Sequence, residues 1–197
     1  NTSVIQSVSP YWKHRVTLFE VLPNNPNEII FLGNSITDGC EWSELFGNPS
    51  IINRGISGDR TDGVLQRLSE VTESKPSKVF IMIGVNDISG GIELNKITLN
   101  YRDIIEKIKS DSPDTKIYIQ SVLPTLNHPF VKNDSVVVLN QKLKNLTEEY
   151  SLKYINLYDS FKNQNGDLKE ELSYDGLHLG GQGYLLWKSI IEPYVSE

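Results

Sequence analysis

Short apolar runs that alternate with helical periodicities place the strongest constraint on what this chain can fold into. Each run is four to seven residues long and contains Ile. The runs occupy residues 28–33, 50–53, 78–84, 116–122 and 153–157. A continuous apolar run of this length, bounded by turn residues, is typical of a strand that is covered on both faces of a sheet. We therefore predict five buried strands.

Between these runs, apolar residues recur three and four positions apart, as they do on one face of a helix. The periodicity covers residues 64–71, 101–108, 136–150 and 185–191, with a weaker first segment at 38–46. The last helix is expected to end before Pro193, and residues 1–27 to form an irregular or short helical lead-in. Strands joined by helical crossovers run parallel, so we predict an α/β fold: a three-layer α/β/α sandwich with a five-stranded parallel sheet of the flavodoxin-like kind.

Length and composition exclude several classes of protein. The chain has 197 residues, little more than one domain of roughly 150 residues, so we expect a single domain over residues 1–197. Nineteen Lys and Arg against 25 Asp and Glu give a net charge of −6, which argues against a nucleic-acid partner. No apolar run approaches the roughly 18 residues of a membrane-spanning helix, so an integral membrane protein is excluded. A single cysteine, Cys40, cannot form an internal disulfide, and no Cys and His spacing indicates a zinc site.

Ser35 lies where the first predicted strand passes into a helix. Ligands of parallel sheets bind beyond the carboxyl ends of the strands, so this hydroxyl is expected at the functional edge. By itself Ser35 is typical of a helix N-cap, with Asp38 three residues later completing a capping box. The other loops at the same edge favour a second interpretation, in which the hydroxyl is a nucleophile.

His178 is the one histidine of three with an acidic partner at a useful spacing. Asp175 precedes it by three residues, which places the two side chains together on a turn or short helix. In that arrangement the carboxylate accepts a proton from one ring nitrogen and leaves the other free to act as a base toward a hydroxyl. His14 falls in the lead-in and His128 lies beside Pro129, so neither is a candidate base.

Two further loops could supply hydrogen bonds to a developing oxyanion. Asn86 directly follows an apolar strand, where its amide can donate, although Asn-Asp after Gly-Val is also ordinary turn chemistry. Gly58 lies in the loop after the second strand. A glycine there indicates either a positive backbone dihedral or a backbone amide that a substrate can approach closely.

These loops together resemble a known family. Gly-Asn-Ser-Ile-Thr at 33–37, Asn-Arg-Gly-Ile-Ser-Gly-Asp at 53–59, Gly-Val-Asn-Asp at 84–87 and Asp-Gly-Leu-His at 175–178 look like the four separated blocks of the SGNH, or GDSL-type, esterases and lipases, in the family's order. The resemblance spans residues 28 to about 190. It is closest to the platelet-activating-factor acetylhydrolase-like and acetylxylan or sialate O-acetylesterase-like branch.

The resemblance implies a role for each block. Ser35 would be the nucleophile, His178 the general base and then acid, and Asp175 its orienting partner. The amides of Ser35 and Gly58 and the side chain of Asn86 would form the oxyanion hole, and no metal or other cofactor would be needed. The family's first block usually reads Gly-Asp-Ser, and because the family assigns no proton transfer to that aspartate, we expect Asn34 to change local hydrogen bonding more than chemistry.

The sequence also favours a substrate class. No long apolar loop is present to cover a fatty chain, so a short acyl group such as acetyl is expected. Three aromatic residues could supply a stacking surface for a sugar or could belong to the core: Trp42, Phe46 and Trp187. We expect the substrate to be a small-molecule or glycan ester, and within that class we favour an acetyl ester on a carbohydrate. The chain begins with Asn1 instead of Met, which together with a glycan substrate favours an exported, periplasmic or secreted, protein.

Three alternatives remain open on the sequence. The first is a lysophospholipase or thioesterase of the same fold. The second is a flavodoxin-like phosphate- or flavin-binding protein, because a Ser and Thr loop after the first strand can present amides to a phosphate. The third is a hydrolase that uses Mg²⁺ held by aspartates at the predicted sheet edge. The candidate ligands are Asp38, Asp59, Asp87 and Asp175.

Overall fold

The computed structural model describes residues 9–197, so the first eight residues of the predicted lead-in lie outside the described part. Within that part, five strands form one parallel sheet in the order β2-β1-β3-β4-β5. The strands are β1 Ile29–Gly33, β2 Ile51–Gly55, β3 Lys78–Met82, β4 Lys116–Gln120 and β5 Lys153–Ile155. Every residue of the central strands β1 and β3 is buried. The predicted five-stranded parallel sheet is therefore confirmed, and the reason is the double-sided burial that the apolar runs require.

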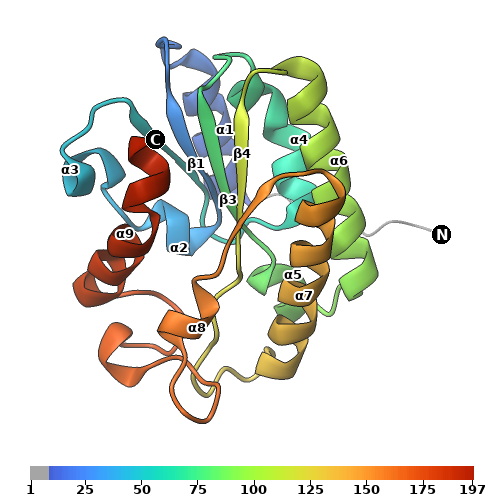
Figure 1. Ribbon diagram of the computed structural model, residues 1–197, viewed down its shortest axis with the longest axis vertical. Helices are drawn as coiled ribbons and strands as arrows, with labels where there is room; N and C mark the ends of the chain where they lie inside the picture. The colour runs from blue at the N-terminus through green and yellow to red at the C-terminus, as the bar shows by residue number, and fades with distance from the viewer. Residues whose placement is uncertain (1–8) are drawn as a thin grey trace.

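Helices cover both faces of the sheet (Figure 1). On one face α4 packs against α1 and α6, and α6 packs against α7, while α3 and α9 cover the opposite face. The helices are α1 Pro10–Val21, α2 Ser35–Asp38, α3 Trp42–Phe46, α4 Thr61–Thr72, α5 Val85–Ser89, α6 Leu94–Asp111, α7 Asn133–Glu149, α8 Tyr158–Phe161 and α9 Gly181–Ser196, with one 3₁₀ turn, η1 Glu170–Leu172. This is the predicted three-layer sandwich.

The helical part of the lead-in is α1. Ser9 caps it, accepting a hydrogen bond from the amide of Trp12, and Pro10 occupies its first position, where a missing N–H costs nothing. The weaker segment predicted at 38–46 divides into α2 and α3, because Gly39 and Cys40 interrupt it.

The last helix continues through Pro193 instead of ending before it, so that prediction was wrong. Lys78 is a buried residue with 6% of its surface exposed. Its ammonium group donates to the backbone carbonyls of Tyr194, Val195 and Glu197 at 2.8–2.9 Å. A cation on the last carbonyls favours the end of a helix through both hydrogen bonding and the helix dipole. We attribute the extra turn to this lysine.

Aromatic side chains fill the core beneath α3 and α9. Phe31 stacks on Trp42 with ring centroids 4.4 Å apart, and the Trp42 and Trp187 rings meet edge to face at 4.8 Å. Trp42 is 1% exposed and Trp187 is fully buried, while Phe46 packs against the same cluster. Trp42 and Trp187 therefore belong to the core and offer no stacking surface to a sugar, whereas Phe46 is only partly buried.

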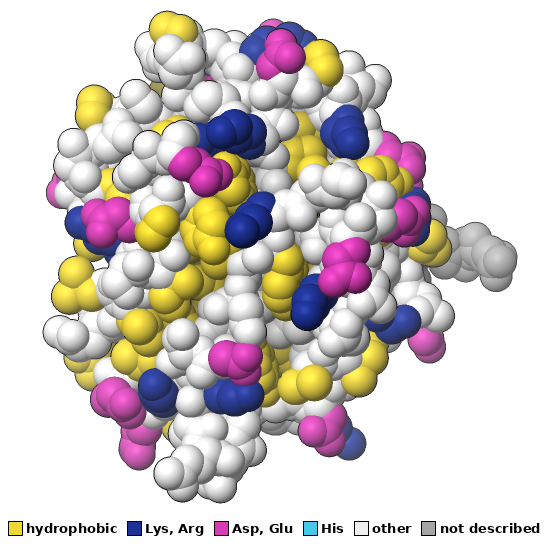
Figure 2. Space-filling view, viewed as in Figure 1, with side chains coloured by type: hydrophobic (Ala, Val, Ile, Leu, Met, Phe, Trp, Pro, Cys, Tyr) yellow, Lys and Arg dark blue, Asp and Glu magenta, His cyan; other side chains and the backbone are white. Residues whose placement is uncertain are grey.

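Charged side chains of both signs are interspersed over the surface (Figure 2), without a continuous basic area on the face in view. Among residues 9–197, no helix is both long and apolar enough to cross a membrane.

Candidate active site

Ser35 is the first residue of α2, directly beyond the end of β1. The N-cap of this helix is Asn34, whose Oδ1 accepts a hydrogen bond from the amide of Ile36 at 3.1 Å. The interpretation of Ser35 as the cap is therefore wrong, and Asp38 does not complete a capping box, because its carboxylate accepts from the hydroxyl groups of Tyr11 and Ser57. The Ser35 hydroxyl is left facing His178, with Oγ 2.9 Å from the ring Nε2.

His178 and Asp175 share a tight turn before α9. The ring Nδ1 of His178 lies 2.6 Å from Asp175 Oδ2, and Asp175 Oδ1 accepts from the amides of Leu177 and His178 at 2.9 and 2.7 Å. Desolvation by itself would raise the pKa of Asp175, but the hydrogen bonds from His178 and from the two amides outweigh it, so the pKa lies well below its ordinary value. Asp175 is thus held as a carboxylate, and the backbone amides of Leu177 and His178 fix its orientation.

The turn requires the glycine at position 176. Gly176 has a φ of +79°, and a Cβ there would lie 2.1 Å from the carbonyl oxygen of Leu126. The Leu126 amide in turn donates to the Gly176 carbonyl at 2.8 Å. The loop after β4 therefore supports the turn that carries Asp175 and His178.

This pair is open to solvent, because 45% of the His178 side chain and 54% of the Asp175 side chain are exposed. Water screens such a pair, so the ion pair contributes little to stability. The hydrogen bond to Asp175 nevertheless orients the imidazole ring of His178.

Gly58 and Asn86 come from the loops that follow β2 and β3. Gly58 has a φ of +80°, which any other residue would adopt only with strain. Asn86, in the first turn of α5, donates from Nδ2 to the backbone carbonyl of Asp59 at 2.9 Å. Asn86 is therefore tied to the residue that follows Gly58, at the same edge of the sheet as Ser35.

A buried charge network that sequence reasoning missed lies beneath these loops. Arg67 on α4 is fully buried; its Nε donates to Asp59 Oδ2 at 2.8 Å and its Nη1 to Glu70 Oε1 at 3.0 Å. Its Nη2 donates to the carbonyls of Gly33 and Arg54. The signal in the sequence was a charged residue at position 67 on the apolar face between Val64 and Val71.

The four rim aspartates do not gather into one site. Asp38 bonds to Tyr11 and Ser57, Asp59 to Arg67, and Asp175 to His178. Asp87 accepts from the amide and hydroxyl of Thr61, and burial raises its pKa to about 6. Among residues 9–197 no group of three His, Cys, Asp or Glu side chains is arranged to hold a metal ion. The aspartates therefore give the Mg²⁺ alternative no support.

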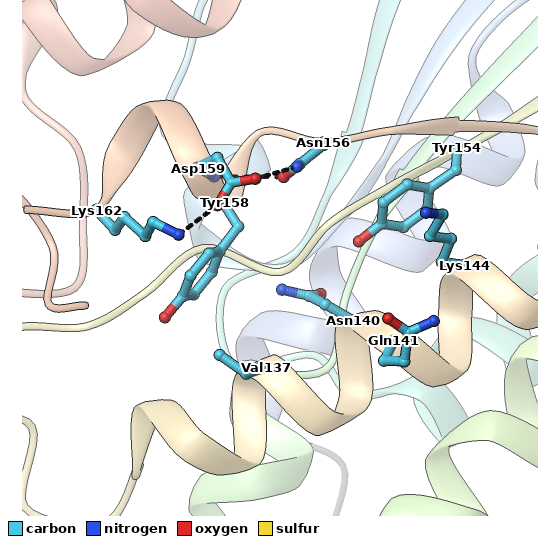
Figure 3. Close-up of a pocket in the computed structure, with 9 residues that line it drawn as sticks. All are labelled: Val137, Asn140, Gln141, Lys144, Tyr154, Asn156, Tyr158, Asp159 and Lys162. Carbon is cyan, nitrogen blue, oxygen red and sulfur yellow. Dashed lines mark hydrogen bonds and ion pairs between the residues drawn. The ribbon is translucent and has the colours of Figure 1, made fainter.

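A separate pocket of about 240 Å³ lies between α7, β5 and α8 (Figure 3) and contains none of the candidate site residues. Its Asp159 carboxylate is bonded to Lys162 and to Asn156. The Nδ2 of Asn140 donates to the Val122 carbonyl, and its Oδ1 accepts from the Val122 amide, so it supports the backbone after β4.

Comparisons with known proteins identify the family of this chain. Residues 31–186 match the GDSL-like lipase/acylhydrolase family. The chain belongs to this family. Platelet-activating factor acetylhydrolase IB subunit alpha1 of Rattus norvegicus is 27% identical over 164 residues, which cover 80% of this chain and 70% of the rat protein.

Solved structures of GDSL-type enzymes share the fold. The lipase/acylhydrolase of Enterococcus faecalis superposes with a TM-score of 0.76 at 25% identity, covering 86% of this chain and 95% of that one. A catalytic mutant of an acetylxylan esterase from Geobacillus stearothermophilus gives a TM-score of 0.72 at 17% identity over 88% and 95% of the two chains, a likeness of fold. The predicted family and fold are confirmed, and this GDSL-type protein is a carboxylic ester hydrolase. The flavin-binding alternative is thereby set aside.

Proposed function

We propose that this acylhydrolase removes acetyl groups from carbohydrate esters through a Ser35, His178 and Asp175 triad. His178 Nε2 takes the proton of the Ser35 hydroxyl, and the oxygen attacks the ester carbonyl. The alcohol leaves with that proton, and the acetyl group remains on Ser35. Water then attacks the acetyl-enzyme with His178 again as base, which releases acetate and restores the serine.

The observation that carries the proposal is the chain of hydrogen bonds from Asp175 Oδ2 through both ring nitrogens of His178 to Ser35 Oγ. The carboxylate on Nδ1 favours the ring form whose Nε2 is a free base, and it stabilises the imidazolium that forms during attack. Ser35 and His178 are 143 positions apart in the sequence, so the fold, and not closeness along the chain, brings them into contact.

The oxyanion of the tetrahedral intermediate would be bound by the amides of Ser35 and Gly58 and by the side chain of Asn86. The bond from Asn86 to the Asp59 carbonyl supports this assignment, because it fixes the amide group before substrate arrives. Donors that are oriented in advance stabilise developing charge without a cost of reorganisation during the reaction.

The acetyl group and the carbohydrate are argued from different observations. The names of two relatives, a platelet-activating factor acetylhydrolase and an acetylxylan esterase, both specify an acetyl ester. Only the second name specifies a carbohydrate. The half-exposed His178 and Asp175 also suit a polar alcohol, since a substrate beside them keeps contact with water.

A series of p-nitrophenyl esters from acetyl to octanoyl tests both nucleophile and acyl length. We expect kcat/KM to be highest for acetate and to fall with each longer chain. Ser35→Ala should lower it by at least about 10⁴-fold, because no other group forms the acyl-enzyme. Ser43→Ala on α3 is the matched control, since it removes the same hydroxyl elsewhere. Full activity of Ser35→Ala would refute the triad, and a preference for octanoate would favour the lysophospholipase or thioesterase alternative.

A further inference from the structure

Helix α1 lies outside the part of the chain that matches the family, which begins at residue 31. Two neighbouring side chains at the start of this helix nevertheless reach the edge of the sheet that carries the candidate site. They are Tyr11 and Trp12, and each donates a hydrogen bond to an aspartate next to one of the loops with a proposed catalytic group. The mechanism proposed above uses neither residue.

Trp12 bonds to Asp59, the residue after Gly58. The indole Nε1 donates to Asp59 Oδ1 at 3.1 Å, and Arg67 Nε donates to Oδ2 at 2.8 Å, so both oxygens of this fully buried carboxylate are held. The backbone carbonyl of Asp59 accepts from Asn86 Nδ2 at 2.9 Å. An amide group has two N–H bonds, so this contact leaves the second one for an oxyanion. The position of Asp59 therefore determines where that N–H points.

Tyr11 bonds to Asp38, the last residue of α2. Its hydroxyl donates to Asp38 Oδ2 at 2.8 Å, and the same oxygen accepts from the amide and the hydroxyl of Ser57 at 3.1 and 2.8 Å. Ser57 directly precedes Gly58, and α2 begins with Ser35. Asp38 thus joins the loop that carries the Gly58 amide to the helix that carries Ser35, and Tyr11 is a further donor at this junction.

Apolar contacts attach α1 to the same loop. Val16 and Phe19 of α1 form a small buried cluster with Ile56, which lies in the loop after β2, and Trp12 packs against this cluster. The guanidinium of Arg54 on β2 lies 4.6 Å from the centre of the Phe19 ring, within the range of a cation–π contact. The helix is therefore fixed on the loop before any substrate arrives.

We propose that α1 supports the oxyanion hole, with Trp12 and Tyr11 as positioning residues that act through Asp59 and Asp38. This inference deepens the proposed function and rests on it. Charge develops on the oxyanion only as the tetrahedral intermediate forms, so loss of the support weakens the transition state more than it weakens substrate binding. Acylation and deacylation both pass through such an intermediate, so kcat should fall while KM changes little.

Trp12→Phe is the principal test, because it keeps an aromatic ring but removes the N–H that bonds to Asp59. Hydrolysis of p-nitrophenyl acetate gives kcat and KM, and stoichiometric labelling of Ser35 by a p-nitrophenyl phosphonate counts the competent active sites. We expect kcat per site to fall by about ten-fold with KM within about two-fold of the wild type, as the loss of one hydrogen bond to a charged group predicts. Tyr11→Phe should lower kcat by about three-fold, because its bond is exposed to water.

Trp187→Phe is the matched control, because it removes an indole N–H that donates to Gln120 Oε1 at 2.7 Å in the core. It should lower the midpoint of thermal unfolding but leave kcat per site within about two-fold of the wild type, less than the weakest positioning bond would change it.

A double-mutant cycle separates positioning from general destabilisation. If Trp12 acts through Asn86, its replacement should matter less once the amide that it positions is absent. We expect Trp12→Phe to lower kcat per site by no more than about three-fold in an Asn86→Ala background, against about ten-fold in the wild type, because residues that act as one unit are not additive.

Three results would overturn the proposal. One is a kcat per site within about two-fold of the wild type in both Trp12→Phe and Tyr11→Phe. A second is an equal loss for Trp12→Phe in the two backgrounds, which would make its effect independent of Asn86. The third is a loss in Trp187→Phe as large as that in Trp12→Phe, which would make the effect one of stability. Hydrolysis that survives Ser35→Ala would instead contradict the proposed function, whatever α1 does.

Discussion

Replacement of Arg67 by methionine tests whether the buried charge network supports the candidate site. Arg67 contacts the carboxylates of Asp59 and Glu70 and the carbonyls of Gly33 and Arg54, and none of its side chain is exposed. Methionine has similar length and flexibility but cannot donate a hydrogen bond. The substitution therefore removes the charge and the donors while filling much of the volume.

The expected loss of stability in Arg67→Met depends on which hydrogen bonds the carboxylates of Asp59 and Glu70 retain. Asp59 retains hydrogen bonds from Trp12 and from the Arg60 amide, and Glu70 retains the Nε of Arg54 at 3.0 Å. Both carboxylates still lose a buried cation, so we expect the free energy of unfolding to fall by about 3–5 kcal/mol at pH 7, as is usual when one partner of a buried pair is removed. Arg102→Met, which breaks a solvent-exposed pair with Glu149, should lower the free energy of unfolding far less, because water screens that pair.

The pH dependence of this cost is a second test. Burial already raises the pKa of Asp59 and of Glu70, and Arg67 is the largest influence that lowers both. Without Arg67 the two values rise further, so the folded state binds protons more tightly than the unfolded state. Stability then falls as pH rises, and the difference between Arg67→Met and wild type should be larger at pH 8 than at pH 5.

Urea unfolding at several pH values measures these differences, and steady-state hydrolysis measures the effect on catalysis. Because Asp59 follows Gly58 and its carbonyl holds Asn86, we expect kcat to fall by at least about ten-fold, since a misplacement near 1 Å can cost 10²-fold. An unfolding free energy within about 1 kcal/mol of wild type at every pH, the range of an exposed pair, would refute the reasoning.

Further predictions concern the catalytic loops. Asn86→Ala should lower kcat by about 10²–10³-fold in steady-state assays while a folded spectrum is retained, because one oxyanion donor is lost. Asp175→Asn should lower kcat less than His178→Ala does, since it removes the group that orients the base but keeps the base. The pKa of Asp175 is depressed, so its contribution to stability, small because water screens the exposed pair, is present above the ordinary value of about 3.9 and is lost at lower pH. In urea unfolding, the small difference between wild type and Asp175→Asn should therefore disappear only below about pH 4. Gly176→Ala should lower the unfolding free energy by about 1–3 kcal/mol or more in urea, since φ is positive and the added Cβ would meet the Leu126 carbonyl.

The sheet could be predicted because its residues are constrained locally. A strand covered on both faces needs consecutive apolar side chains, so the runs in the sequence mark the strands directly. Their ends are less certain: the run at 78–84 outlasts β3, which ends at Met82, because Ile83 is buried beyond the last ladder position. The prediction that the last helix ends before Pro193 failed for a related reason. Lys78, which supports the end of α9, is more than 110 positions away in the sequence.

Properties that depend on distant contacts could not be predicted. The spacing of Trp42 and Trp187 fits a surface as well as a core, and it is their burial in the folded chain that assigns them to the core. The sequence likewise could not predict that Arg67 supports the site, because only the fold brings its partners Asp59 and Gly33 next to it. In contrast, His178 and Asp175 were found because their contact is made within one turn.

Asn34 shows how a departure from a family pattern can be understood from structure. Its side chain is 1% exposed, and its Oδ1 caps α2 by accepting from the Ile36 amide. The aspartate that is usual at this position would offer the same acceptor, but it would also bring a buried charge next to Ser35, at the cost of desolvation. In the proposed mechanism the proton moves between Ser35 and His178 and never passes through position 34. The cap therefore requires an acceptor and not a charge, which explains why an amide can replace the carboxylate here.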